Sequence, residues 1–204
     1  MASRRLPRSF YARDTILVAR ELLGMHLVHR TPHGEFVGRI VETEAYQGPE
    51  DLAAHSARAR SARTEVMFGA AGHAYVYLIY GMWNCLNVVT RTIEVPHAVL
   101  LRAVEPISGV TSSTHGPGLL CRAFELDRSH SGLDMTKSDL WIERPKGVIS
   151  PAEIIASPRI GVDYAGSWAQ KPWRFYDAHS PYVSTLSAAA RRRILASLLE
   201  LPSK

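Results

Sequence analysis

The stretch Arg39-Ile-Val-Glu-Thr-Glu-Ala-Tyr-Gln-Gly-Pro-Glu-Asp51, with His55 close behind it, decides how the rest of the chain is interpreted. It begins with the alternation typical of a half-buried strand, and Gly48-Pro49 ends that strand. A period of two places four side chains on one face: Ile40, Glu42, Glu44 and Tyr46. Acids beside an isoleucine are costly to bury unless the face lines a polar cleft or each acid has a partner. The stretch predicts a functional cleft or, as the alternative, edge-strand acids in surface ion pairs.

Length and charge limit the possible architecture and partners. The 204 residues fit one domain, and a hydrophobic fraction of 46% suffices for a core. No linker stands out, so we expect a single domain over residues 1–204, with residues 1–9 as a flexible basic arm. The net charge of +5 permits an anionic partner. Arginine provides 20 of the 24 basic residues, which suits phosphate contacts, although GC-rich codon use produces the same bias.

Other features narrow the class of protein. Two cysteines without CxxC spacing indicate a reducing compartment. The nine histidines show no metal-ligand spacing, so we expect no metal and no cofactor. No apolar run reaches the roughly 18 to 20 residues of a membrane span, and the N-terminus lacks a signal-peptide core. We therefore expect an intracellular monomer, in a bacterial cytoplasm rather than a nucleus.

Hydrophobic patterns predict an α+β fold with a mainly antiparallel sheet flanked by helices. A helix is expected from Asp14 or Thr15 to about Leu23, and a strand at 25–30 then turns through 32–34 into the strand that carries Glu44. Short connections favour an antiparallel meander of strands at 73–81, 86–92 and 98–105. The remaining expected elements are a helix at 118–124, strands at 141–144, 154–155 and 159–162, and a terminal helix at 187–199.

Two side chains stand out in the predicted meander. Arg102 lies in the middle of an apolar strand, so it needs an acid or an anion beside it. Glu42 and Glu44, one or two strands away, are the candidates. Tyr80 precedes Gly81 at a strand end, so we expect its ring at a hairpin tip, where rim packing is the alternative to a wedge that enters DNA.

Three arginines, Arg58, Arg60 and Arg63, are spaced among alanines and serines between residues 51 and 67. Arginines with small neighbours can approach a phosphate backbone closely, which makes this a candidate phosphate-binding segment. A solvated basic face is the equally weighted alternative.

Nine short motifs follow one another along the chain. They are Val41-Glu-Thr-Glu-Ala-Tyr46, Ala54-His-Ser56, Met67-Phe68, Gly72-His-Ala-Tyr-Val-Tyr-Leu-Ile-Tyr-Gly-Met82, Cys85-Leu-Asn87, Leu100-Leu-Arg-Ala-Val-Glu-Pro106, His115-Gly-Pro-Gly118, Arg159-Ile-Gly161 and Pro172-Trp-Arg-Phe175. In this order they resemble the alkyladenine (3-methyladenine) DNA glycosylase family, from about Phe10 to Ser184. The resemblance implies a compact antiparallel-sheet fold distinct from the helix-hairpin-helix glycosylases. It also implies hydrolysis of the N-glycosidic bond of damaged purines in double-stranded DNA, such as 3-methyladenine, 7-methylguanine, hypoxanthine and ethenoadenine.

The resemblance also implies a role for each matching residue. The implied catalytic groups, which hold and activate a water, are Glu44, Arg102 and the backbone carbonyl of Ile160. The implied base pocket consists of Tyr46, His55 and Tyr77, with Asn87 as the side chain that screens out a guanine amino group. Tyr80 resembles the residue that fills the gap in the duplex, and Met82 is a further candidate DNA contact.

Lysine placement separates two kinds of glycosylase. A glycosylase that also nicks the strand needs an amine for a Schiff base, and no lysine lies within residues 39–105. We therefore expect a monofunctional enzyme. The alternatives are a damage sensor that flips bases without cutting, which needs neither Glu44 nor Arg102, and an unrelated RNA-binding or nucleotide-modifying protein. The loop at 109–118 is shorter than in mammalian relatives, and Leu119 stands where they carry a lysine.

Overall fold

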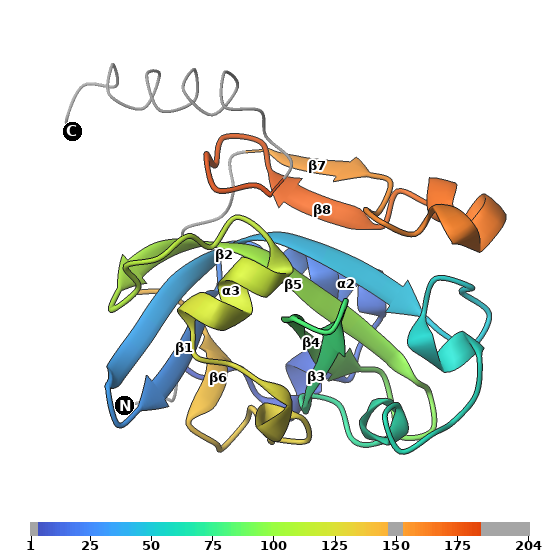
Figure 1. Ribbon diagram of the computed structural model, residues 1–204, viewed down its shortest axis with the longest axis horizontal. Helices are drawn as coiled ribbons and strands as arrows, with labels where there is room; N and C mark the ends of the chain where they lie inside the picture. Colours follow the sequence, from blue (N-terminus) through green and yellow to red (C-terminus); the bar gives the residue numbers. More distant parts are fainter. Residues whose placement is uncertain (1–3, 147–152, 185–204) are drawn as a thin grey trace.

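An eight-stranded sheet carries the fold. The computed structural model describes residues 4–146 and 153–184 (Figure 1). Its helices are α1 (Arg8–Tyr11), α2 (Thr15–Glu21) and α3 (Pro117–Ala123), with 3-10 turns at His55–Ala57, Glu65–Phe68, Arg128–His130 and Asp163–Gln170. Its strands are β1 (His26–Thr31), β2 (Gly34–Gln47), β3 (Ala74–Ile79), β4 (Trp83–Thr90), β5 (His97–Ser108), β6 (Leu140–Glu143), β7 (Ile154–Ser157) and β8 (Arg174–Asp177).

The sheet is organised around β2, which is the strand of the opening stretch. The strand order is β3-β4-β5-β2-β1-β6, and β8 pairs with β2 and with β7. All of these pairs are antiparallel, so the expected fold class is confirmed. The predicted meander is also confirmed, because β3 pairs with β4 and β4 with β5. The register between β2 and β5 is irregular around Glu42, beside the site described below.

Helices cover the sheet from both sides. Asp14 caps α2, as predicted, because its Oδ1 accepts from the N–H groups of Ile16 at 3.0 Å and Leu17 at 3.1 Å. α2 lies behind the sheet in Figure 1, where Thr43 Oγ1 of β2 donates to the Ala19 carbonyl at 2.8 Å. α3 lies in front of it and packs on β4 and β5. The acids of β2 therefore point away from α2.

The N-terminal segment departs from the sequence expectation. Residues 1–9 were expected to form a flexible basic arm, whereas residues 4–9 pack against the domain. Leu6 is buried, and its N–H donates to the Ile142 carbonyl of β6 at 2.8 Å. Arg8 pairs with Asp134 at 2.6 Å. An apolar side chain beside an open strand edge explains this packing, and residues 1–3 lie outside the described part.

A second departure concerns residues 159–162, which were expected to form a strand. They form a loop instead, because the polar groups of Arg159 and Ile160 bond to the site rather than to a neighbouring strand. The expected strand at 154–155 is confirmed as part of β7. The expected helix at 187–199 lies outside the described residues.

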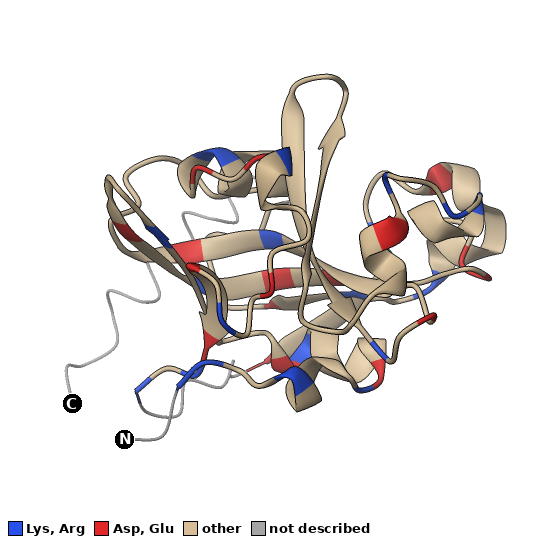
Figure 2. Ribbon diagram, turned by 90° about the horizontal axis from the view of Figure 1, so that it is seen from below, with Lys and Arg blue, Asp and Glu red and all other residues tan. Residues whose placement is uncertain are grey.

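The β3–β4 hairpin projects from the body of the molecule. Its turn centres on Tyr80 and Gly81, whose φ angles are 53° and 70°. Two consecutive positive φ angles match the twist of a tight hairpin, and glycine adopts them without strain. Figure 2 shows this hairpin as a projection without charged residues, flanked by elements that carry them.

Candidate active site

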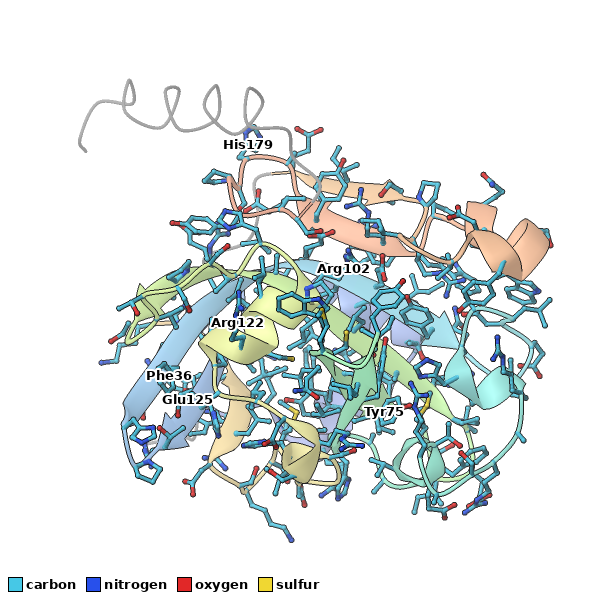
Figure 3. All side chains as sticks on the ribbon, viewed as in Figure 1. Phe36, Tyr75, Arg102, Arg122, Glu125 and His179 are labelled. Atoms are coloured by element: carbon cyan, nitrogen blue, oxygen red, sulfur yellow. The ribbon has the colours of Figure 1, made fainter. Side chains whose placement is uncertain are left out.

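A cavity of about 740 Å³ opens beside the β3–β4 hairpin. Its walls come from the hairpin, from residues 52–63, from residues 116–119 at the start of α3, and from residues 160–164. Arg102 of β5 and Tyr75 of β3, both labelled in Figure 3, lie on two of the strands that border it. This volume lies within the range of small-molecule pockets, so the cavity has room for a purine base.

Glu44 lies just behind the wall of this cavity, where it accepts two hydrogen bonds and forms one ion pair. Its Oε1 accepts from the backbone N–H of Ile160 at 2.8 Å. Its Oε2 accepts from the Tyr46 hydroxyl at 2.8 Å and lies 3.3 Å from Arg102 Nη1. The Glu44 side chain has no exposed surface, while all three of these partners are cavity-lining residues. Arg102 was predicted to have an acidic partner, and this is confirmed.

Arg102 also binds the second acid of β2. Its Nε donates to Glu42 Oε1 at 3.0 Å, so one guanidinium joins Glu42 and Glu44. Glu42 is fully buried and receives three further donors: Arg174 Nη1 at 2.8 Å, the Ser184 N–H at 2.7 Å and Ser184 Oγ at 2.9 Å. Burying two carboxylates is tolerable here because each has cationic and hydrogen-bonding partners.

The predicted base-pocket residues all line the cavity. His55 and Tyr77 touch edge to face, with ring centroids 4.4 Å apart, and His55 Nδ1 is 3.0 Å from the Tyr75 hydroxyl. Burial, with smaller contributions from Arg63 and Arg58, lowers the pKa of His55 to about 4. The imidazole is therefore neutral at pH 7.

Asn87 is held in one orientation at the floor of the cavity. Its side-chain amide donates to the Tyr75 carbonyl at 3.0 Å and to the Cys85 carbonyl at 3.4 Å. Burial raises the pKa of the Cys85 thiol to about 11, so this cavity-lining cysteine stays protonated at neutral pH. Its two hydrogen bonds hold the Asn87 amide in one orientation.

Behind Tyr46 lies an ion pair that sequence reasoning missed. Arg159 Nη2 donates to Asp51 Oδ1 at 2.8 Å, and neither side chain is exposed. Arg159 Nη1 also donates to the Ala45 carbonyl at 2.9 Å, and its guanidinium lies 4.7 Å from the centre of the Tyr46 ring. The pair thus anchors the loop whose next residue, Ile160, contacts Glu44. Asp51 and Arg159 are 108 residues apart in the sequence, so no local pattern predicts that they pair.

The candidate DNA-contacting residues differ in their surroundings. Arg58 and Arg63 line the cavity and are exposed, and Arg63 lies 5.3 Å from the centre of the Tyr77 ring. Arg60 is engaged elsewhere, in ion pairs with Glu65 at 2.6 Å and Glu94 at 2.7 Å.

At the hairpin tip, Tyr80 is 83% exposed and Met82 is 68% exposed. Two large exposed side chains close together on a projecting turn form a candidate contact surface. The expectation that the Tyr80 ring stands at a hairpin tip is confirmed.

The described residues meet neither the requirements of a metal site nor those of a membrane-spanning helix. Within residues 4–146 and 153–184, no three His, Cys, Asp or Glu side chains gather closely enough to hold a metal ion. No helix in the same described ranges is long and apolar enough to cross a membrane.

Comparison with known proteins identifies the family. The sequence profile described as methylpurine-DNA glycosylase (MPG) matches residues 9–181. The chain belongs to the methylpurine-DNA glycosylase family. Proteins named "Putative 3-methyladenine DNA glycosylase" are similar over most of its length. One from Legionella pneumophila (strain Corby) is 52% identical over 183 residues, which cover 89% of this chain and 98% of that protein.

Two further relatives carry the same name. The protein from Methanocella arvoryzae is 51% identical over 193 residues, covering 88% of this chain and 95% of its own length. The protein from Myxococcus xanthus is 50% identical over 190 residues, covering 92% of this chain and 97% of its own length. This methylpurine-DNA glycosylase is thus a DNA-repair protein of the glycosylase class, with DNA as its substrate.

Proposed function

We propose that this glycosylase is monofunctional. In this proposal it flips alkylated or deaminated purines out of duplex DNA, including 3-methyladenine, 7-methylguanine, hypoxanthine and ethenoadenine, and hydrolyses their N-glycosidic bond. The observation that carries the proposal is the position of Glu44, which is bound by Arg102 and by the Ile160 N–H behind the wall of a cavity with room for a purine base.

Glu44 acts in this proposal as the base that activates a water. The water oxygen bonds to C1′ of the sugar while the bond from C1′ to the purine breaks, and its electron pair leaves with the base. The water proton goes to Glu44. A carboxylate also stabilises the oxocarbenium-like state through which glycosidic cleavage passes. Because Glu44 is fully covered in this state, the water enters only when one of its three covering groups shifts on binding of the flipped nucleotide.

The flipped base stacks between Tyr46 and the paired rings of His55 and Tyr77. His55 and Tyr77 already touch each other, so the space for a base lies between that pair and Tyr46. Stacking on aromatic side chains contributes roughly 1 to 3 kcal/mol per base, which offsets part of the cost of unstacking. The Tyr80 ring fills the vacated stack, a use for which its exposed position suits it.

The absence of lyase activity is supported by the composition of the cavity. Among the described residues that line it there is no lysine, so no side-chain amine is available there for a Schiff base with the abasic sugar. The product is therefore an intact strand with an abasic site. The protein acts as a monomer, since one chain contains the whole proposed site.

Base release from lesion duplexes tests the proposal. Purified protein is incubated with duplexes that hold hypoxanthine, ethenoadenine, 7-methylguanine or 3-methyladenine, and each reaction is divided between alkaline and neutral work-up. We expect strand breaks after alkali only. Breaks at neutral pH would show a lyase, and binding of all four lesions without any base release would show a damage sensor.

A further inference from the structure

Among the described residues, one aromatic side chain both lines the pocket and forms a hydrogen bond with Glu44, the proposed catalytic carboxylate. Tyr46 lines the cavity with its ring, and its hydroxyl donates to Glu44 Oε2 at 2.8 Å. The two residues are two positions apart on β2, so the strand itself places them on the same face. Among the described residues, no other base-pocket side chain forms a hydrogen bond with Glu44.

We propose that Tyr46 is a positioning residue for Glu44: its hydroxyl fixes Oε2, so that Oε1 is the oxygen that takes the proton from water. This inference rests on the proposed function, and it gives Tyr46 a second task beyond stacking. A carboxylate oxygen offers two lone pairs. Oε2 accepts a hydrogen bond from Tyr46 and also forms the ion pair with Arg102, whose Nη1 lies 3.3 Å away, so these two groups restrict the space from which a water could reach Oε2. On Oε1 the described donor is the Ile160 N–H, which leaves one lone pair for water.

The surroundings keep Tyr46 in place for this task. The Arg159 guanidinium covers one face of its ring, at 4.7 Å from the ring centre, and is itself held by the buried Asp51. Only the opposite ring face is left for a base. Burial, together with the neighbouring Glu44 carboxylate, raises the pKa of Tyr46 well above its usual value, so the phenol keeps its proton and remains a donor.

A base that stacks on the free face therefore contacts the same ring whose hydroxyl orients the Glu44 carboxylate. The position of the stacked base and the orientation of Glu44 are thus coupled through Tyr46. Such coupling acts on the chemical step rather than on binding, because the hydroxyl itself points at Glu44 and not at the base.

The variant Tyr46→Phe tests the inference, since it keeps the ring and removes the hydroxyl. We expect single-turnover release of hypoxanthine to fall roughly 10-fold, while the Kd for a hypoxanthine duplex changes by less than about 3-fold. Release of 7-methylguanine should fall by the same factor, because water activation is common to neutral and cationic bases. The control Tyr176→Phe removes a hydroxyl from β8, away from the cavity, and should leave both rates unchanged.

A double-mutant cycle with Glu44→Gln shows whether the hydroxyl acts through the carboxylate. In the Glu44→Gln background, Tyr46→Phe should have no further effect on the rate. Wild-type rates in Tyr46→Phe would overturn the inference, as would additive effects in the cycle. A loss confined to hypoxanthine would also overturn it, since the hydroxyl would then act on the leaving base.

If the wild-type protein released neither base, the proposed function itself would fail, which is a distinct outcome. Retained lesion binding verifies that each variant is folded.

Discussion

Arg102 and Glu42 form a buried ion pair, with Nε 3.0 Å from Oε1, and the same guanidinium reaches Glu44. The orientation of the arginine beside the candidate catalytic carboxylate thus depends on an acid that does not line the cavity. Arg174 and Ser184 complete the set of partners around Glu42 and link β8 and the chain beyond it to the site. Several elements distant in sequence therefore converge on one carboxylate.

The first prediction concerns this second acid. Glu42→Gln removes a buried charge and leaves Arg102 and Arg174 without their shared partner, so we expect the free energy of unfolding to fall by about 3 kcal/mol. The matched control is Glu65→Gln, which breaks an exposed pair with Arg60 and should cost far less, because solvent screens that pair. Urea unfolding at pH 7 measures both. Equal losses in the two variants would show that the buried network does not stabilise the fold.

The second prediction separates the three arginines that the sequence treated alike. Arg58 and Arg63 are exposed at the cavity, whereas Arg60 is neutralised by Glu65 and Glu94. On B-DNA, log affinity falls with log salt by about 0.9 for each phosphate contact. We expect Arg58→Ala and Arg63→Ala each to flatten this slope by about one contact, and Arg60→Ala to leave it nearly unchanged. Binding titrations between low and moderate salt provide the slopes. A flattened slope in Arg60→Ala alone would reverse the assignment.

The third prediction concerns pH. In the folded state the pKa of His55 is about 4, well below the usual histidine pKa of about 6.5. Between about pH 6.5 and pH 4, His55 is protonated in the unfolded state and neutral in the folded state. The free energy of unfolding therefore falls as the pH drops through this range. His55→Gln removes this contribution. We expect the wild-type protein to lose more unfolding free energy than the variant between pH 7.5 and pH 4.5. Identical losses would mean that His55 has an ordinary pKa in the folded protein.

The fourth prediction concerns the hairpin tip. Tyr80 adopts a φ of 53°, which costs a residue with a Cβ roughly 1 kcal/mol, while glycine adopts it freely. Tyr80→Gly should therefore be more stable to urea than Tyr80→Ala by about that amount. Both variants should excise hypoxanthine from duplex DNA more slowly than wild type, because neither fills the vacated stack. Wild-type rates on duplex substrate in both variants would refute the wedge role.

Much of the fold followed from local patterns. The alternation from Arg39 to Tyr46 predicted β2, and Asp14 predicted the start of α2, because both signals lie within a few residues of what they determine. The acidic partner of Arg102 also followed, since a buried arginine requires one. The residues named from the family motifs as the base pocket line one cavity.

What the sequence could not predict depends on contacts between distant segments. The Arg159–Asp51 pair joins residues 108 positions apart, and the packing of Leu6 on β6 joins the N-terminal segment to residue 142. Residues 159–162 carry a strand-like composition, yet tertiary bonds to Glu44 and Asp51 hold them as a loop. Ile160 was expected to act through its carbonyl; the structure adds a contact of its N–H with Glu44.

The central claim is that Glu44 cleaves the glycosidic bond by activating water. Its most direct test is single-turnover release of hypoxanthine by wild type and Glu44→Gln, which keeps the shape of the side chain and removes its charge, with lesion binding measured in parallel. We expect Glu44→Gln to bind the lesion duplex like wild type and to cut at least about 100-fold more slowly. Equal cutting by the two proteins would contradict the claim and leave a glycosylase with a different catalytic group.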